Sequence, residues 1–335
     1  MRAMLLERLG AIESRPLKSK TIDEPVIDKD EILVRIKACG VCRSNLHMIE
    51  GDWIGRNVPS TLPLIPGHEI VGIIESIGKD VDDFKIGDRV GIQPLYYACG
   101  VCEYCLTGRE NICLNRKITG QDVDGGYAEY LKIQSKFAYK VPNKINDSEA
   151  APLFCPGITA YRAVKKSNTA PGKILAIFGI GGVGHVAVQL ARLWDAKVIA
   201  VSRNEKHLEL ASKLGAEDIV YPKEVEKYFK KIGYADSSIV FAPSNKAINQ
   251  ALSITKRGGT IVLGVSGKIL NFQFFQEKTV QGTVIGTRQD MIDVLEIAAN
   301  GKMKIFTENH KLEEANEVLK KLKYGEIEGR AVLLP

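Results

Sequence analysis

The sequence of 335 residues lacks a long apolar run and has no segment with the features of a secretory signal. Its longest apolar region, residues 174–190, is interrupted by four glycines and by His185, whereas a membrane-spanning helix needs about 20 consecutive apolar residues. The first ten residues mix charged side chains with short apolar stretches, unlike the continuous apolar core of a signal peptide. We therefore expect a cytoplasmic protein with no membrane partner.

Aromatic residues are few, at 7% of the chain, and they do not alternate with the basic residues. The formal net charge of +6 is carried by basic residues spread along the chain, in short lysine groups such as Lys165-Lys166 and Lys320-Lys321. Nucleic-acid-binding proteins instead concentrate basic side chains on one face or along one helix, so we expect no nucleic-acid partner. The chain also lacks low-complexity linkers and internal repeats, and its length favours two domains that each bury a core.

Cysteine is also scarce, with only seven in the chain, yet four of these fall close together. Cys99, Cys102, Cys105 and Cys113 follow the spacing C-x2-C-x2-C-x7-C. Clustered cysteines in a chain that is not secreted are more often metal ligands than disulfides, and four adjacent thiolates suit tetrahedral zinc. The spacing therefore predicts a structural zinc lobe over about residues 95–115.

Two types of residue pattern divide the chain. In the first half, residues 31–38, 68–77 and 127–133 carry β-branched and aromatic residues between Gly, Pro and Asp, which predicts strands of a small barrel or sandwich. From about Lys173, strands alternate with helices, which predicts an α/β fold with a doubly wound parallel sheet. The expected strands there are 173–178, 197–201, 218–220, 238–241 and 260–263. One expected helix follows the first strand and ends near Trp194, and two others span 205–214 and 246–254.

Two later segments refine this division. The interval between Val220 and Ser238 is short for a full strand-to-strand crossover, so we expect its helix to be shortened. Near the C-terminus, apolar residues recur at helical spacing from Leu312 to Leu322, and residues 331–334 form a further strand. This pattern predicts that the chain returns to the first domain.

A glycine-rich turn lies between the strand at 173–178 and the helix that follows it. The turn from Gly179 through Gly181, Gly182 and Val183 to Gly184 fits G-x-G-x-x-G. In this setting the first glycine makes the turn, the second lets the backbone approach a dinucleotide pyrophosphate, and the third lets helix and strand pack closely. The turn therefore predicts a nicotinamide dinucleotide cofactor.

The residues after the next strand bear on the choice between NAD and NADP. An Asp or Glu there would bind the ribose 2′-hydroxyl and repel a 2′-phosphate, but this chain has Ser202-Arg203-Asn204. Arg203 can form a charge-assisted pair with a phosphate, so the sequence favours NADP. The alternative is a solvated arginine beside a site that still accepts NAD.

Several motifs follow one another in a fixed order along the chain. They are G-V-C-R-S-N-L-H from Gly40, G-H-E from Gly67, the four-cysteine lobe, C-P-G-I-T-A-Y from Cys155, the glycine turn, and E-G-R-A-V-L-L-P at the end. With these motifs the chain resembles the zinc-dependent medium-chain alcohol dehydrogenases over essentially its whole length. The resemblance implies a GroES-like, β-rich catalytic domain at 1–154 and 287–335, and a Rossmann domain with a doubly wound parallel sheet at 155–286.

The resemblance also implies roles for individual residues. Taken singly, Cys42, His68 and Cys155 are more often buried structural residues than ligands. In the pattern of the family, however, these three would hold a catalytic zinc, with Glu69 able to ligate transiently, so we expect two zinc ions per chain. The other implied roles are proton transfer by Ser44 and His47, contact with the cofactor phosphates by Arg43 and Arg330, and contact with the nicotinamide ring by Thr159 and Val265.

One position departs from the commonest pattern of the family. Where the family usually has an Asp that accepts a hydrogen bond from the ligand histidine, this chain has Asn45, which can still accept that bond but brings no charge. His68 should then be a less basic ligand, with weaker metal retention or a more acidic bound water. Cys39 matches no ligand position, and we interpret it as a packed core thiol.

The activity implied is hydride transfer between an alcohol, or the corresponding aldehyde or ketone, and a nicotinamide cofactor, with NADP favoured over NAD. Trp53, Leu95, Tyr96 and Phe154 would line an apolar substrate pocket or would simply pack in the core. The alternatives are a polyol or sugar dehydrogenase of the same superfamily and, because of Asn45, a cofactor-binding protein without turnover. The family also implies a homodimer or homotetramer.

Overall fold

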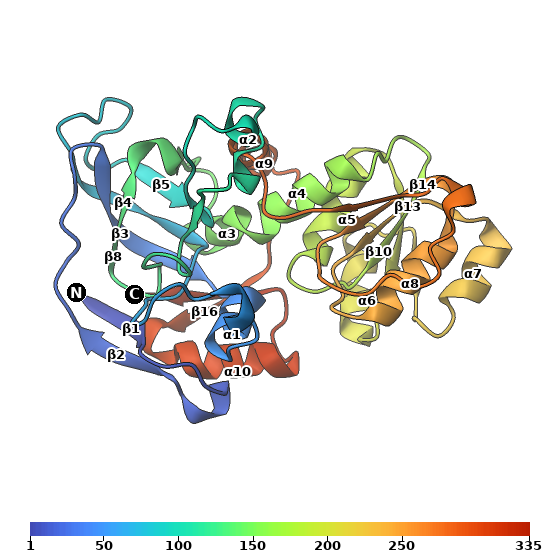
Figure 1. Cartoon of the computed structure of the whole chain (residues 1–335), viewed down its shortest axis with the longest axis horizontal. Helices are drawn as coiled ribbons and strands as arrows, with labels where there is room; N and C mark the ends of the chain where they lie inside the picture. The colour runs from blue at the N-terminus through green and yellow to red at the C-terminus, as the bar shows by residue number, and fades with distance from the viewer. The chain divides into compact units, whose positions relative to one another are not determined.

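The structure is a computed structural model that describes all residues from Met1 to Pro335. The chain forms two compact units, labelled by element in Figure 1. The first unit comprises Met1–Cys155, Thr287–Ala299 and Lys304–Pro335, and the second comprises Pro156–Gly286 and Asn300–Met303. This division differs from the expected one at Cys155, which groups with the first unit, and at residues 300–303, which group with the second.

The first unit is built on a seven-stranded sheet in the order β16-β17-β3-β4-β5-β9, with β8 paired to β3. All three strands expected here are present, but β4 and β8 begin two and three residues later than expected, because His68, Glu69 and Tyr127 lie in the preceding loops. β17 pairs antiparallel with β3, so the C-terminal segment does return to the first unit. The strands are β3 (Glu31–Gly40), β4 (Ile70–Ile77), β5 (Arg89–Ile92), β8 (Tyr130–Gln134), β9 (Ala138–Lys140), β16 (Thr307–Lys311) and β17 (Arg330–Leu334).

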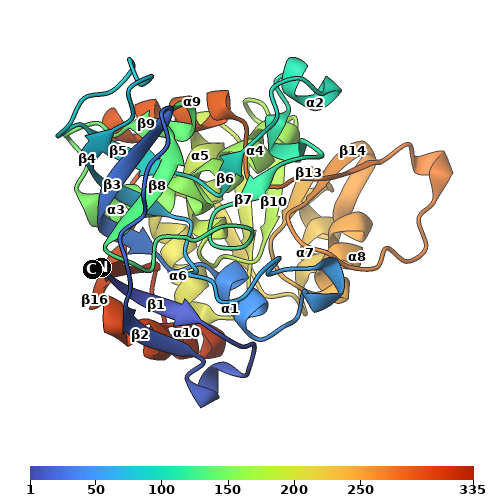
Figure 2. The same ribbon diagram turned by 60° about the vertical axis from the view of Figure 1, so that its left-hand side comes forward.

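Shorter elements complete the first unit. The hairpin of β1 (Arg2–Leu6) and β2 (Leu17–Thr21) lies beside α10 (Ala315–Tyr324) in both views (Figures 1 and 2). The short strands β6 (Leu95–Tyr97) and β7 (Lys117–Ile118) pair with each other on either side of the four-cysteine segment. The remaining helices of this unit are α1 (Arg43–Ile49), α2 (Glu103–Leu106), α3 (Asp147–Ala150) and α9 (Arg288–Ala299).

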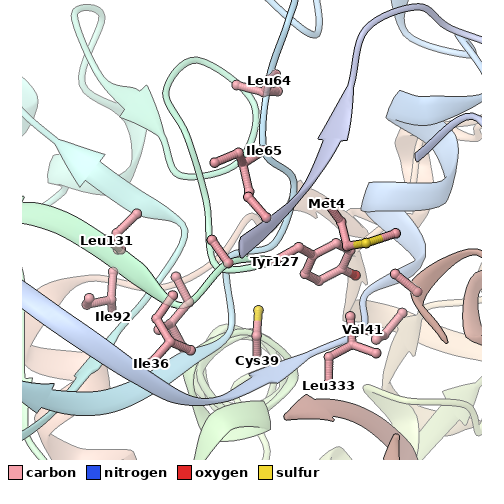
Figure 3. Packing of buried hydrophobic residues seen from close by; sticks show 14 of the residues in the cluster. Met4, Ile36, Cys39, Val41, Leu64, Ile65, Ile92, Tyr127, Leu131 and Leu333 are labelled. Atoms are coloured by element: carbon pink, nitrogen blue, oxygen red, sulfur yellow. The ribbon is translucent and has the colours of Figure 1, made fainter. Parts of the chain in front are cut away.

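The core of the first unit surrounds Tyr127, which is fully buried. Figure 3 shows Tyr127 among Met4, Val41 and Leu333, so strands from both ends of the chain contribute to one cluster. Cys39 is fully buried in the same cluster, as expected for a core thiol, and burial raises its pKa.

The second unit contains a six-stranded sheet in the order β12-β11-β10-β13-β14-β15, with every neighbouring pair parallel. This is the strand order 3-2-1-4-5-6 of a Rossmann fold. The strands are β10 (Ile174–Phe178), β11 (Lys197–Val201), β12 (Asp218–Val220), β13 (Ala235–Val240), β14 (Thr255–Leu263) and β15 (Thr279–Gly282). The helices are α4 (Pro156–Lys166), α5 (Gly184–Leu193), α6 (Glu205–Lys213), α7 (Val225–Ile232) and α8 (Asn245–Ile254).

These elements agree with the alternating pattern of the sequence. β11 and β12 have the expected bounds, and α7, between Val220 and Ser238, is a short helix of 8 residues. β13 and β14 begin earlier than expected because their pairing starts at Ala235 and Thr255, before an irregularity in register. No helix in either unit combines the length and the apolarity that crossing a bilayer requires.

A glycine in the first unit makes a close packing contact that can be tested. A Cβ added to Gly91 on β5 would lie 1.9 Å from Cζ of the fully buried Phe154. We predict that Gly91→Ala destabilises the protein by about 1–3 kcal/mol, the usual cost of overpacking a core. The midpoint of urea-induced unfolding should fall accordingly. Gly55→Ala is the control, because nothing lies within 4 Å of its added Cβ; equal midpoints for the two variants would contradict the prediction.

Candidate active site

Four side chains of the first unit bring metal-ligating atoms together. The ligand atoms of Cys42, His68, Glu69 and Cys155 all lie within 4.8 Å of one another. The pairing of β3 with β4 explains much of this arrangement, because Cys39 is the partner of Ile70. The residues just after β3 and just before β4 therefore meet at the same end of the sheet. Cys155 comes directly after a short 3-10 helix, Ala151–Phe154.

The two thiols of this cluster are held at metal-binding distance. The Sγ atoms of Cys42 and Cys155 are 3.9 Å apart, and two sulfurs bound to one tetrahedral zinc at 2.3 Å each would be about 3.8 Å apart. The hydrogen bond from Cys155 lowers the pKa of the Cys42 thiol well below its usual range, and the same contact raises the pKa of Cys155. One thiolate therefore forms readily in the cluster.

A buried ion pair lies directly beside the thiols. Arg330, at the start of β17, donates hydrogen bonds to Glu69 Oε1 at 2.5 Å and to the Val41 carbonyl at 2.8 Å. Burial raises the pKa of Glu69 to about 7, while the Arg330 guanidinium favours the ionised carboxylate. Glu69 Oε2 has no hydrogen-bond partner, and a Cβ at Gly40 would lie 2.0 Å from it. The carboxylate thus has one oxygen anchored and one left as a possible ligand.

The contacts of Arg330 bear on its predicted role at the cofactor phosphates. Arg330 is only 4% exposed, and its guanidinium donates to Glu69 and to Val41; contact with the cofactor phosphates stays a prediction. Arg43, also predicted to contact phosphates, is the exposed first residue of α1.

Asn45 contacts His68 differently from what the sequence suggests. Its Oδ1 accepts from the Tyr127 hydroxyl at 3.3 Å and from the backbone N–H of Cys42 at 3.4 Å. Because the carbonyl oxygen is already used, the amide Nδ2 faces His68 Nδ1, at 3.4 Å. Asn45 therefore presents its amide nitrogen to His68 Nδ1, rather than the carbonyl oxygen that was expected to accept a hydrogen bond, and the Ser44 hydroxyl lies next to the other ring nitrogen, Nε2.

The two residues expected to transfer protons lie on one face of α1, three residues apart. Ser44 Oγ is 3.4 Å from His68 Nε2, so it lies next to the metal-ligating atoms. His47 Nδ1 is 2.7 Å from Asp52 Oδ2, and its ring packs against Trp53 with the centroids 5.6 Å apart. Asp52 was not predicted from the sequence, although it lies only five residues after His47.

The four-cysteine segment forms a second cluster. The Sγ–Sγ distances are 3.5 Å for Cys99–Cys113, 3.6 Å for Cys102–Cys105, 3.8 Å for Cys102–Cys113 and 4.0 Å for Cys99–Cys105. These values bracket the edge of about 3.8 Å expected for a tetrahedral zinc–sulfur site. Backbone N–H groups of Val101 and Cys102 lower the pKa of Cys99 to about 6. The donor set fits one structural zinc ion.

In the second unit, the three glycines of the G-x-G-x-x-G pattern have the geometry that their expected roles require. Gly179 has φ +93°, and a Cβ there would lie 2.6 Å from the backbone nitrogen of Ala242. A Cβ at Gly184 would lie 2.0 Å from the Gly179 carbonyl oxygen, so α5 packs directly on the turn. At Gly181, by contrast, an added Cβ meets nothing within 4 Å. The turn is closed on the protein side and open where a pyrophosphate would approach.

The other residues expected at the cofactor lie around the same sheet. Gly182 and Val183 complete the turn, Thr159 lies on α4, and Val265 follows β14. Ser202 follows β11, and its Oγ accepts a hydrogen bond from the backbone N–H of Asn204 at 3.2 Å. Arg203 is exposed, and the three residues between β11 and Glu205, the first residue of α6, include no carboxylate.

The four candidate pocket residues divide into two kinds. Leu95 and Phe154 are fully buried, and the Phe154 ring packs 6.2 Å from Tyr139. Trp53 and Tyr96 are partly buried and pack against the core cluster that contains Leu95. Leu95 and Phe154 are therefore core residues, which was the alternative interpretation, whereas Trp53 and Tyr96 remain accessible.

The chain is similar in sequence to known proteins. Residues 28–143 match the family model of the alcohol dehydrogenase GroES-like domain, and residues 182–300 match that of the zinc-binding dehydrogenases. An alcohol dehydrogenase from Geobacillus stearothermophilus is 42% identical over 341 residues, covering 99% of both chains.

Solved structures give the same result. The alcohol dehydrogenase from the hyperthermophilic archaeon Aeropyrum pernix superposes with a TM-score of 0.91 at 33% identity, covering 100% of both chains. A putative zinc-binding dehydrogenase from Sinorhizobium meliloti 1021, bound to NADP, has a TM-score of 0.88 at 28% identity and covers 100% of this chain and 99% of its own. Together with the two ligand clusters and the glycine turn, these matches show that the chain belongs to the zinc-dependent medium-chain alcohol dehydrogenases and is a zinc-containing, NAD(P)-dependent enzyme.

Proposed function

We propose that the enzyme transfers a hydride between a small alcohol and NADP, with Cys42, His68 and Cys155 holding the catalytic zinc. The observation that carries this proposal is the convergence of these ligand atoms within 4.8 Å, with the Ser44 hydroxyl 3.4 Å from His68. Three protein ligands leave one position open, as in catalytic rather than structural zinc sites. The bound zinc supplies the Lewis acidity that lowers the pKa of an alcohol hydroxyl.

The residues of the chain then do three things. Ser44 accepts the alcohol proton at Oγ and passes it toward His47, which returns it to solvent. Glu69 stays anchored to Arg330 through Oε1, and its free Oε2 is available as a transient ligand. The open backbone at Gly181, with Gly182 and Val183, receives the cofactor pyrophosphate, Arg43 contacts its phosphates, and Thr159 and Val265 contact its nicotinamide ring.

A substrate panel tests this function. Primary and secondary alcohols, the matching aldehydes and ketones, and polyols and sugars would each be assayed with NADP(H) and NAD(H). We expect turnover of simple alcohols and carbonyls that is lost on chelation and regained with zinc. Preference for polyols or sugars would overturn the substrate class, and cofactor binding without turnover of any compound would overturn the proposed reaction.

The four-cysteine cluster is proposed to hold a second zinc, so the first prediction from the proposed function concerns metal content. Because two complete ligand clusters are present, we predict two zinc ions per chain in protein purified without chelators. Metal analysis by mass spectrometry would measure this. Cys105→Ser should lose one zinc and lower stability, while Cys42→Ser should lose the other and abolish turnover. Finding one zinc or none in the unmodified enzyme would refute the two-site assignment.

The preference for NADP rests on the segment after β11. No carboxylate is present there to repel a 2′-phosphate, and Arg203 is exposed at the position where it can pair with one.

The second prediction follows for Arg203→Ala. Loss of a hydrogen bond to a charged group should weaken NADP(H) binding by about 1.5–3 kcal/mol and leave NAD(H) binding nearly unchanged. Binding would be measured by fluorescence titration with each reduced cofactor. Arg257→Ala is a matched control, because Arg257 is exposed near the amino end of β14. Dinucleotides bind at the carboxyl ends of the strands in such a sheet. Equal losses with both cofactors would show that Arg203 does not recognise the phosphate.

The third prediction concerns Asn45. If His68 binds zinc through Nε2, its proton lies on Nδ1, where it meets the amide Nδ2 of Asn45. An aspartate could accept from Tyr127, from the Cys42 N–H and from His68 together. We therefore predict that Asn45→Asp slows zinc release to a chelator by about 10–100-fold, the range seen for such partners elsewhere.

Tyr127→Phe is the control for this experiment. It removes one hydrogen bond to Asn45 Oδ1 but leaves the groups facing His68 in place. Zinc release would be followed with a chromophoric chelator. An unchanged release rate for Asn45→Asp would make Asn45 a residue that only orders the local backbone.

We further propose that the enzyme is a homodimer or homotetramer. β15 is an edge strand of the parallel sheet, and the segment before it exposes Phe272, Phe274 and Phe275. An exposed edge strand beside large apolar side chains favours pairing with another chain.

A further inference from the structure

His47 has a carboxylate partner that the proposed proton path does not yet use. Asp52 Oδ2 is 2.7 Å from His47 Nδ1, within strong hydrogen-bond distance. Trp53 packs on the ring of His47 at 5.6 Å between centroids, with the planes tilted by 31°. The Asp52 carboxylate contacts the edge of the imidazole and Trp53 packs on its face, so the ring has a defined orientation.

The local backbone brings Asp52 back to His47. α1 ends at Ile49, and Gly51 has φ +82°, a left-handed conformation that reverses the chain direction at low cost for glycine. The backbone N–H of Asp52 then donates to the His47 carbonyl at 2.9 Å. Main chain and side chain of Asp52 therefore both bond to His47, and the pairing is part of how this helix terminates.

The neighbouring carboxylate is engaged elsewhere. Glu50 Oε1 accepts from Lys323 Nζ at 2.8 Å and from the backbone N–H of Ile12 at 3.0 Å. Glu50 therefore ties the end of α1 to α10 and to the N-terminal segment. Asp52 is the carboxylate that serves His47.

We infer that Asp52 is a positioning residue that holds the Nδ1–H tautomer of His47, so that Nε2 keeps the lone pair that accepts the substrate proton. This inference rests on the proposed proton path through Ser44 and His47. Imidazole carries one proton on one nitrogen when neutral, and the hydrogen bond of one nitrogen decides which nitrogen is free. A carboxylate acceptor at Nδ1 requires the proton there and leaves Nε2 basic.

The proton balance of the step is simple. Nε2 takes the proton released by the alcohol through Ser44, and the ring becomes an imidazolium that still donates to Asp52 through Nδ1. Nε2 then releases that proton to bulk water, and Asp52 accepts the hydrogen bond from Nδ1 throughout, as the carboxylate of a catalytic triad does. Because the Asp52 side chain is 53% exposed, solvent screens its charge and its effect is modest.

The first test measures the tautomer in enzyme without cofactor. Labelling the five histidines with ¹⁵N allows the protonated ring nitrogen of each to be identified by NMR, and His47→Gln assigns the His47 signals. We expect Nδ1–H in the unmodified enzyme and a shift toward Nε2–H in Asp52→Ala. Asp82→Ala, which removes an exposed carboxylate of the same unit, is the control and should leave the tautomer unchanged. Nε2–H in the unmodified enzyme would overturn the inference.

The second test is a double-mutant cycle on turnover. Asp52→Ala should lower kcat for alcohol oxidation by about 1.5–5-fold, the scale of exposed charge pairs, and Asp52→Glu should recover part of the loss. In a His47→Ala background the same change should have no further effect. An equal loss in both backgrounds would show that Asp52 acts on structure rather than through His47.

The proton path through His47 and the role of Asp52 can be tested separately. Full activity of His47→Ala would remove His47 from the proton path, and the role of Asp52 would fall with it. A slow His47→Ala variant combined with a fully active Asp52→Ala variant would leave the path intact and overturn the role of Asp52 alone.

Discussion

The pairing of β3 with β4 on one side and β17 on the other is the constraint on which the metal cluster depends. Cys39 is opposite Ile70 on β4 and opposite Leu333 on β17. Cys42 therefore emerges beside the residues that precede β4, and Arg330 enters from the start of β17. Backbone hydrogen bonds of the sheet, rather than any affinity among the side chains, place a thiol, an imidazole and a guanidinium together.

The charges of this cluster are balanced within the protein. A buried carboxylate is unfavourable unless it is paired, and Arg330 supplies the opposite charge at 2.5 Å from Glu69. The same guanidinium bonds to Val41, next to Cys42, so the ion pair also anchors the backbone that carries a ligand. Glycine at position 40 leaves the space that the second carboxylate oxygen occupies. The Glu69–Arg330 pair therefore both neutralises a buried charge and positions the residues of the metal cluster.

The features that could be predicted from the sequence are those whose residues lie close together along the chain. The glycine turn needs three residues without a Cβ within six positions, and the four-cysteine lobe needs its ligands within a short segment, so both leave a readable spacing. The orientation of Asn45 depends on Tyr127, 82 residues away, and the position of Arg330 depends on Glu69, 261 residues away. Neither contact has a periodicity or spacing that marks it. Strands of two or three residues, such as β6 and β7, were missed because they are too short to show an alternating pattern.

The long separation between Glu69 and Arg330 also has a consequence for protein synthesis. The second unit is almost continuous in sequence, so its sheet can form while the ribosome is still adding residues. The first unit needs β17, which follows the whole second unit in the sequence. Glu69 thus has no counterion until Arg330, 261 residues further along the chain, has left the exit tunnel. The metal centre of the first unit is therefore completed only after the whole second unit has been synthesised.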